Sequence, residues 1–177
     1  MNHTLFSWTP RRARQCPAWI FAFLLGFGIL YATGAQARVV RPAPSFPWLN
    51  AQGKVQSSQV FLGQPVILLI APSPRDWAFR SQVGQLQRVY ERLAAQNAVF
   101  FATFTLEPGM IRSNIPFVTV PEGAKVSALF APPRAFGIAI IGRDGNLDTL
   151  TSRVLSGQRI CDILNNSYVT QSMLRRE

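Results

Sequence analysis

Side chains that could carry out covalent or acid–base chemistry are few in this sequence. Its 177 residues include one histidine, His3, two cysteines, Cys16 and Cys161, 18 Lys+Arg and 8 Asp+Glu. His3 and Cys16 precede an N-terminal apolar segment that we expect to be removed, so the mature chain would keep one thiol and no imidazole. That excludes Ser-His-Asp and Cys-His nucleophiles, histidine general-base catalysis and His-ligated metal or haem.

Cys161 has two interpretations. It stands beside Ile160, Ile163 and Leu164, where it fits a small buried hydrophobe. The alternative is a redox-active or intermolecular thiol. With one cysteine left, an exported protein has no internal disulfide, so its stability must come from its core.

Oxygen ligands for a metal are suggested at one place only. Asp144, Asn146 and Asp148 match the first three ligand positions of a calcium loop, D-x-N-x-D. Thr149 stands where such a loop needs glycine, and Leu155 where it needs a bidentate carboxylate. A hairpin turn is therefore the better interpretation, and we predict no metal site and no cofactor.

The N-terminus has the organisation of a signal peptide. Arg11, Arg12 and Arg14 precede the apolar run 19–31, and small residues at 35 and 37 fit the two positions that a signal peptidase reads. We predict a signal peptide over residues 1–37, cleaved after residue 37.

An uncleaved anchor is the alternative interpretation of the same segment. Residues 15–37 carry no charge over 23 residues, which is long enough to span the ~30 Å hydrocarbon core of a bilayer. Both interpretations place the rest of the chain outside the cytoplasm. We therefore predict a periplasmic or secreted protein, or one anchored in the inner membrane.

The remaining chain is basic. Loss of the three arginines of the leader would leave 15 basic and 8 acidic side chains, a net charge of +7. Such an excess favours anionic lipid head groups, polysaccharide or acidic proteins as partners, and we expect no nucleic acid in that compartment. The arginines are spread along the chain, which is typical of a solvated surface.

A strand–helix–strand unit is predicted after residue 63. The continuous apolar runs 64–70 and 98–104 are typical of strands buried on both faces. Between them we predict one helix of about twenty residues, with Asp76 or Ser73 as its cap and Asn97 at its end. The stripe that predicts this helix consists of Phe79, Val83, Leu86, Tyr90 and Leu93. Such a unit is parallel and right-handed by default.

The second half of the chain predicts a short helix, a hairpin and a closing helix. Residues 116–120 fit an edge strand or a plain connection, and 121–130 a helix with Val126, Leu129 and Phe130 as its apolar positions. Strands at 136–141 and 147–151 flank the Gly-containing turn 142–146. Ser156 caps the last helix.

The segment before these elements is proline-rich. Residues 41–48 contain three prolines, which favour an extended spacer. We therefore divide the chain into a signal peptide, 1–37, a Pro-rich spacer, 38–59, and an α/β domain, 60–177, with the order β-α-β-α-β-β-α.

This order resembles the thioredoxin-like arrangement, a three-layer sandwich. More narrowly, residues 60–177 resemble a secreted bacterial family known only as a domain of unknown function with a thioredoxin-like fold. The residues that carry the resemblance are 69–73 (LIAPS), Gln82, 129–133 (LFAPP), Phe136 and 141–145 (IGRDG). The resemblance implies the fold, an export signal and no assigned activity.

In thioredoxins, paired cysteines stand between the first strand and the first helix, where the helix N-terminus lowers a thiol pKa. Here that place reads Ser73-Pro74-Arg75-Asp76, without sulfur. Pro132 and Pro133 stand where thioredoxins keep a cis-proline. A helix N-terminus and arginines attract anions, so we predict a site for a small anion or a partner's carboxylate. Its residues are Ser73, Arg75, Asp76, Pro133 and Arg134.

We therefore expect an exported thioredoxin-like module without thiol redox chemistry, a binding or scaffold domain rather than an enzyme. Its partner would be an envelope protein or an anionic ligand, and a membrane only if the leader is retained. Two alternatives stay open. One is a single-cysteine redox protein that uses Cys161. The other is a membrane-tethered envelope assembly factor anchored by its leader.

Overall fold

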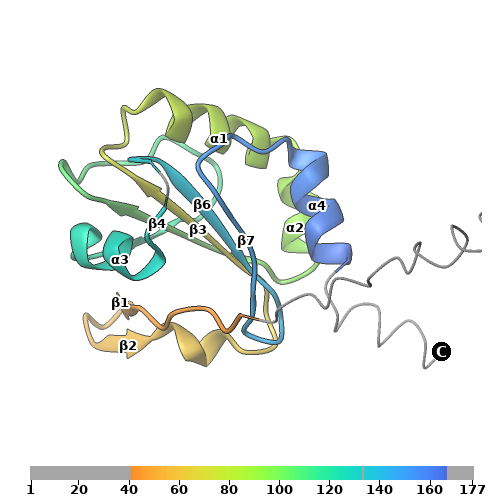
Figure 1. The fold of residues 1–177 in the computed structure, drawn as a ribbon, viewed down its shortest axis with the longest axis horizontal. Coiled ribbons are helices and arrows are strands. Elements are labelled where there is room, and N and C mark those ends of the chain that lie inside the picture. The colour runs from red at the N-terminus through yellow and green to blue at the C-terminus, as the bar shows by residue number, and fades with distance from the viewer. Residues whose placement is uncertain (1–40, 133, 167–177) are drawn as a thin grey trace, which may run out of the picture. The chain divides into compact units, whose positions relative to one another are not determined.

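A computed structural model describes residues 41–132 and 134–166 (Figure 1). The leader predicted over residues 1–37, with its cleavage site, the alternative anchor, His3 and Cys16, lies outside the described residues, and so does Pro133. No helix in residues 41–132 or 134–166 has both the length and the hydropathy needed to cross a membrane.

A five-stranded mixed sheet in the order β5-β4-β3-β6-β7 forms the centre of the fold. Its middle strand, β3 (Val66–Ala71), is buried throughout and pairs parallel with β4 (Val99–Phe104) and antiparallel with β6 (Gly137–Ile141). At the edges, β5 (Val118–Val120) continues parallel to β4, and β7 (Leu147–Thr151) antiparallel to β6. The predicted buried strands and the hairpin are confirmed, and the segment left open as strand or connection contains an edge strand.

The long helix predicted after β3 is two helices, α1 (Trp77–Gln87) and α2 (Tyr90–Ala94), so the prediction of one helix is wrong. Val89 leaves the helical region, with φ −123° and ψ 11°. The apolar stripe nevertheless continues across the break, since Leu86 and Leu93 are both fully buried. Periodicity alone therefore could not reveal the break. Asn97 closes the segment in the left-handed region, φ 59°, as predicted.

Each of the other two helices has one end as predicted, while α3 begins two residues after the predicted start at 121. Helix α3 (Gly123–Phe130) stops at Ala131, which is left-handed with φ 45°. Helix α4 (Gly157–Asn165) is capped by Ser156, whose Oγ accepts a hydrogen bond from the Arg159 backbone N–H at 3.3 Å. Of the apolar positions predicted in α3, Val126 and Phe130 are buried, but Leu129 is 46% exposed.

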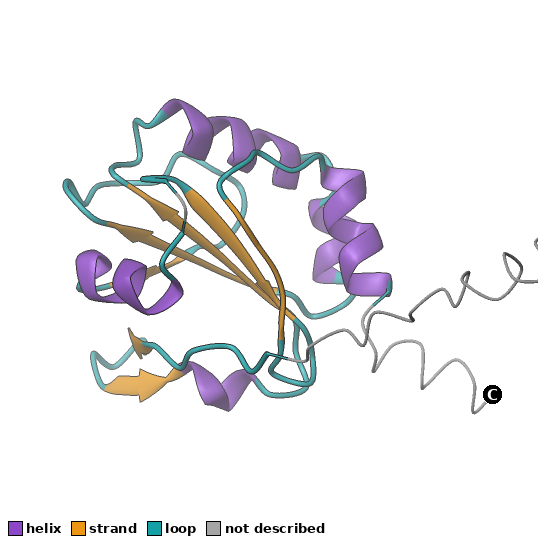
Figure 2. Cartoon of the chain, in the orientation of Figure 1, coloured by secondary structure: helices purple, strands orange, loops and turns teal. Residues whose placement is uncertain are grey.

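The helices cover the sheet in layers (Figure 2). Helices α1, α2 and α4 lie over one face, and α3 lies over the other. Alternate residues of β3 divide between the two cores. Ile67, Leu69 and Ala71 pack with the first group of helices, and Val66, Leu68 and Ile70 pack on the side of α3.

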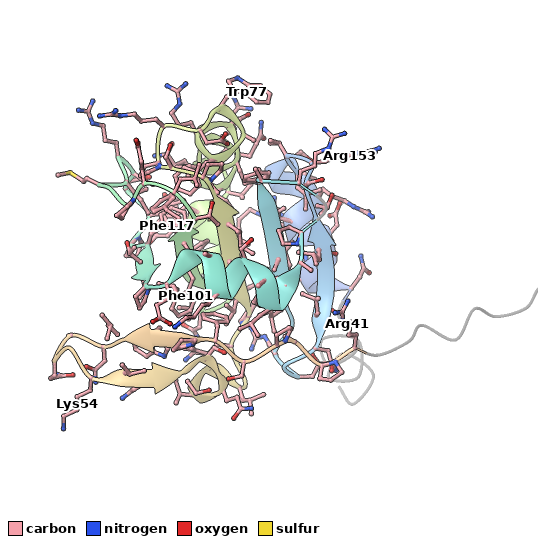
Figure 3. All side chains as sticks on the ribbon, turned by 60° about the vertical axis from the view of Figure 1, so that its left-hand side comes forward. Arg41, Lys54, Trp77, Phe101, Phe117 and Arg153 are labelled. Atoms are coloured by element: carbon pink, nitrogen blue, oxygen red, sulfur yellow. The ribbon has the colours of Figure 1, made fainter. Side chains whose placement is uncertain are left out.

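The N-terminal part of the described chain is a hairpin, so the extended spacer predicted over 38–59 is wrong for residues 41–59. Strands β1 (Pro47–Leu49) and β2 (Val55–Ser57) pair antiparallel and lead into a 3₁₀ turn, η1 (Ser58–Phe61). Phe46 is 1% exposed and meets Phe101 of β4 edge-to-face, with ring centroids 5.3 Å apart. Figure 3 shows Phe101 between the sheet and this hairpin. Aromatic burial outweighs the extended tendency of the neighbouring prolines.

Candidate functional site

The loop between β3 and α1 holds the residues that stand where thioredoxins carry their cysteines. Asp76 caps α1, because its Oδ1 accepts a hydrogen bond from the Phe79 backbone N–H at 2.9 Å. The Asp76 N–H in turn donates to the Ser73 carbonyl at 3.2 Å. A carboxylate therefore already occupies one free donor of the first turn of the helix, while the Arg75 side chain is exposed.

The structure brings only some residues of the predicted anion site together. Ser73, Arg75 and Asp76 lie together before α1, whereas Arg134 is exposed in the connection between α3 and β6 and does not line the pocket described next. Pro133 lies outside the described residues. The peptide bonds of the described residues are all trans. Anion binding at these five residues stays a prediction.

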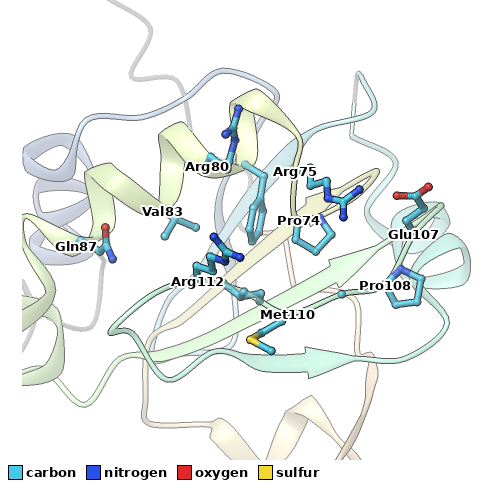
Figure 4. Close-up of a pocket in the computed structure, with 12 residues that line it drawn as sticks. Pro74, Arg75, Arg80, Val83, Gln87, Glu107, Pro108, Met110 and Arg112 are labelled. Atoms are coloured by element: carbon cyan, nitrogen blue, oxygen red, sulfur yellow. The ribbon is translucent and has the colours of Figure 1, made fainter.

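A pocket of about 610 Å³ lies between α1 and the loop that follows β4 (Figure 4). The helix forms one wall with Phe79, Arg80 and Val83, and the loop 107–112 after β4 forms the opposite wall. Pro74 and Arg75 line it from the loop before α1. The pocket thus lies beside the position at which related folds carry their redox centre.

Three arginines line this pocket: Arg75, Arg80 and Arg112. Within the described part of the chain, none of them forms an ion pair or a side-chain hydrogen bond. Arg75 is a site residue predicted from the sequence, whereas Arg80 and Arg112 are not. Arg80 lies on the polar side of the predicted helix, and Arg112 lies in a segment without periodicity, so no sequence signal joined them.

Cys161 lies in α4 and is the free cysteine of the described residues. Its side chain is 0% exposed and belongs to the buried cluster that also contains apolar residues of α1 and α2, with Ile160 and Leu164 as buried neighbours on its own helix. Burial raises the pKa of the Cys161 thiol, the Asp162 carboxylate raises it further, and Arg92 opposes both. The prediction that Cys161 is a small buried side chain is confirmed.

Gln82 fastens the segment before α4 to α1. Its side chain is 0% exposed. Its Nε2 donates to the Leu155 carbonyl at 3.0 Å, and its Oε1 accepts from the Leu155 N–H at 2.7 Å. The glutamine therefore satisfies both backbone groups of one residue. Sequence analysis missed this role, although Gln82 falls on the same helical face as the apolar stripe.

Two exposed contacts add to the attachment of α4. Arg92 Nη1 of α2 donates to Gln158 Oε1 at 2.9 Å, and Gln96 Nε2 donates to Asn165 Oδ1 at 3.1 Å. Exposed side-chain pairs contribute little to stability. The pair of hydrogen bonds from Gln82 and the apolar face of α4 therefore hold this helix in place, and its position keeps Cys161 buried.

Comparison with known proteins shows which of them share this fold. No protein-family model matches the chain, and no curated protein matches it. Among solved structures, an exposed lipoprotein thioredoxin of Streptococcus pneumoniae superposes with a TM-score of 0.54 at 14% identity, covering 70% of this chain and 100% of its own. A thiol:disulfide interchange protein of Chlorobium tepidum gives 0.55 at 17% identity, with 71% and 94% covered.

A thioredoxin peroxidase of Plasmodium yoelii is also similar, with a TM-score of 0.54 at 14% identity and 77% and 90% of the two chains covered. These neighbours overturn our main functional prediction, which was a binding or scaffold module without thiol redox chemistry. The reason is that the proteins named here as a thioredoxin, a thiol:disulfide interchange protein and a thioredoxin peroxidase share the fold of this chain. At 14–17% identity these neighbours show the fold alone, so the alternative, a single-cysteine redox protein, stands as a proposal. The fold of this chain is thioredoxin-like, as its element order predicts.

Proposed function

We propose that this protein is an exported thiol-redox protein of thioredoxin-like fold in which Cys161 is the reacting group. The observation that carries the proposal is the combination of this fold with a single free cysteine in the described chain. The loop between β3 and α1 contains no sulfur, so the chemistry cannot use a pair of cysteines there. Cys161 is then the group left to exchange electrons.

The proposal requires α4 to move. A fully buried thiol cannot meet a disulfide, and its raised pKa keeps it protonated at neutral pH. Helix α4 has nine residues and is the last element that the structure describes. Gln82 of α1 holds the segment before this helix, and the Gly157 N–H of the helix donates to Gln85 Oε1 of α1 at 3.5 Å. The contacts of its side chains with Arg92 and Gln96 are exposed. Detachment of this helix alone would expose Cys161 while the sheet stays paired.

The reaction is one of thiol–disulfide exchange. The Cys161 thiolate attacks one sulfur of a substrate disulfide, the S–S bond breaks, and the other sulfur leaves as a thiolate that takes up a proton. The product is a mixed disulfide at Cys161. Since the described residues contain no second thiol, two molecules of an external low-molecular-weight thiol must complete the cycle. The first attacks the Cys161 sulfur and releases the reduced substrate, which leaves Cys161 in a mixed disulfide with the external thiol. The second attacks the external sulfur of that mixed disulfide, which restores Cys161 and releases the two external thiols as one disulfide.

Export is the second part of the proposal. It rests on the leader features of the sequence, which are the basic residues Arg11, Arg12 and Arg14, the apolar run 19–31 and the small residues before residue 38. The resemblance to a secreted family agrees with it. The intact mass of the protein isolated from its native envelope tests it, because a signal peptide is lost and an anchor is kept. A retained leader would favour the alternative of a membrane-tethered assembly factor.

The redox proposal is tested by exposing the wild-type protein to oxidised glutathione and measuring its intact mass. We expect one glutathione adduct per chain, located at residue 161 by peptide mapping and removed by reduced glutathione. The Cys161→Ser variant, which replaces the sulfur atom by oxygen, is the matched control and should form no adduct at that position.

The adduct must form from the folded state. Its rate should therefore exceed the rate set by global unfolding, which is measured separately by pulse proteolysis. A Cys161 that reacts no faster than the whole chain unfolds, or that never forms an adduct, would refute the proposal.

A further inference from the structure

We propose that the pocket beside α1, bounded by Arg75, Arg80 and Arg112, binds an amphiphilic organic anion. The ligand class is an alkyl chain that ends in a carboxylate or a phosphate ester. This inference goes beyond thiol chemistry and does not depend on Cys161, which lies in the core under α4.

The positive charge of the pocket favours a ligand with an anionic group. Three guanidinium groups line it, against one carboxylate, that of Glu107. Among the described residues no carboxylate lies within ion-pairing distance of Arg75, Arg80 or Arg112. Figure 4 shows that these side chains come from three places: the loop before α1, the helix itself and the facing loop. Arginine binds carboxylate and phosphate through paired N–H donors.

The apolar side chains that line the rest of the pocket favour a ligand with an apolar part. Phe79 and Val83 are buried to 2% and 5% exposure and form the side of the pocket nearest the core. Met110, 88% exposed, and the half-buried Ile111 line the opposite wall. A small hydrated anion would leave this apolar surface in contact with water. An alkyl chain would cover it, and the flexible Met110 side chain can adapt to such a chain.

The size of the pocket fits such a molecule. About 610 Å³ lies within the range of small-molecule sites, roughly 300–1,000 Å³. Polymeric anions such as nucleic acid or polysaccharide need an extended basic groove. The three arginines instead surround one cavity.

Backbone contacts hold the two walls of the pocket against each other. The backbone N–H groups of Leu106 and Glu107 both donate to the Pro72 carbonyl at 3.0 Å, which ties the facing loop to the segment before α1. Gly109 lies against Pro74, so that a Cβ at position 109 would stand 3.2 Å from Pro74 Cγ. A preformed cavity binds without the cost of ordering its own walls.

Calorimetric titration of the full-length protein with dodecanoate, below its micelle concentration, tests the inference. We expect saturable binding to one site, weakened about tenfold by Arg80→Ala and by Arg112→Ala, because each removes one charge-assisted contact. Raising the salt from about 0.05 M to about 0.5 M should also weaken it. Dodecyltrimethylammonium, which has the same chain and the opposite charge, should not compete.

Arg153→Ala is the matched control. Arg153 is an exposed arginine of the connection between β7 and α4 that does not line the pocket, and Figure 3 shows its side chain at the surface. Its removal lowers the net charge equally and should leave the affinity unchanged. Met110→Ser tests the apolar wall and should weaken dodecanoate more than it weakens acetate.

Several outcomes would overturn the inference. Equal loss of affinity in Arg153→Ala and Arg80→Ala would show a general charge effect. Equal competition by dodecyltrimethylammonium would show unspecific hydrophobic binding. Binding to anionic vesicles without binding to free dodecanoate would assign the arginines to a membrane surface. The Cys161→Ser protein should bind dodecanoate as the wild type does, so this test and the glutathione test succeed or fail separately.

Discussion

Replacement of Gln82 by alanine gives the most direct test of how Cys161 is sheltered. The side chain makes two hydrogen bonds to Leu155, at 3.0 and 2.7 Å, from a fully buried position. Each such bond contributes about 1 kcal/mol, and an unpaired buried partner costs about 1–3 kcal/mol. Because Leu155 is only half-buried, water replaces part of the loss. We expect Gln82→Ala to lower the free energy of unfolding by about 2–3 kcal/mol.

The same change should expose Cys161 more often. If labelling of the thiol requires detachment of the segment that Gln82 holds, 2–3 kcal/mol corresponds to a rise in the labelling rate of roughly 30- to 150-fold. The assay is the reaction of the native protein with an aromatic disulfide reagent in excess. Urea unfolding of the same variant gives the global free energy.

The urea dependence of labelling separates local from global opening. Detachment of α4 alone exposes less surface than unfolding does, so labelling should rise with urea less steeply than global unfolding. Gln87→Ala on the same helix is the control, since Gln87 is exposed and its Nε2 reaches Ser113 Oγ only at 3.4 Å. A labelling rate in Gln82→Ala equal to that of the wild type would refute the reasoning.

Further predictions concern the thiol, the cap of α1 and two glycines. Because burial raises the pKa of the Cys161 thiol, the free energy of unfolding of the wild type should fall as the pH rises above ~8.5. Urea unfolding at about pH 7 and about pH 10 measures this fall, which should be smaller in Cys161→Ala. Asp76→Ala removes the hydrogen bond to the Phe79 N–H and should cost about 1 kcal/mol by urea unfolding; a stability change within 0.3 kcal/mol would speak against the cap. Gly84→Ala, in α1, adds a Cβ that would meet no atom within 4 Å outside its own helix, and should stabilise by about 0.5–1 kcal/mol, whereas Gly123→Ala places a Cβ against the Phe104 carbonyl and should destabilise. Equal thermal melting points for these two variants would contradict the packing of α3 on β4.

Much of the secondary structure could be predicted because it depends on local pattern. Residues 64–70 are apolar without interruption, which a strand buried on both faces requires. The turn 142–146 was predicted as a hairpin, and it forms one: the Gly142 N–H donates to the Asn146 carbonyl at 2.9 Å and Gly145 is left-handed with φ 77°. Asp144 Oδ1 accepts from the Asn146 N–H at 3.1 Å within this turn.

Elements that depend on distant partners were missed. The hairpin at residues 47–57 forms because Phe46 and Trp48 find aromatic partners in Phe101 and Phe61. Prolines around them favour an extended chain locally, and nothing local predicts these contacts. The break at Val89 was hidden for a similar reason, since both short helices bury their apolar residues in one core.

The amino-acid sequence by itself determined which chemistry is available to the described chain: one thiol, no imidazole and an excess of arginine. From β3 onward it also determined most of the order of strands and helices, although not the break between α1 and α2, because periodicity and turn residues act over a few positions. Only the tertiary structure decided that Cys161 is enclosed, that Gln82 holds the segment before α4, and that Arg75, Arg80 and Arg112 line one cavity. Burial and charge clustering join residues far apart in the chain, and the path of the backbone alone brings them together.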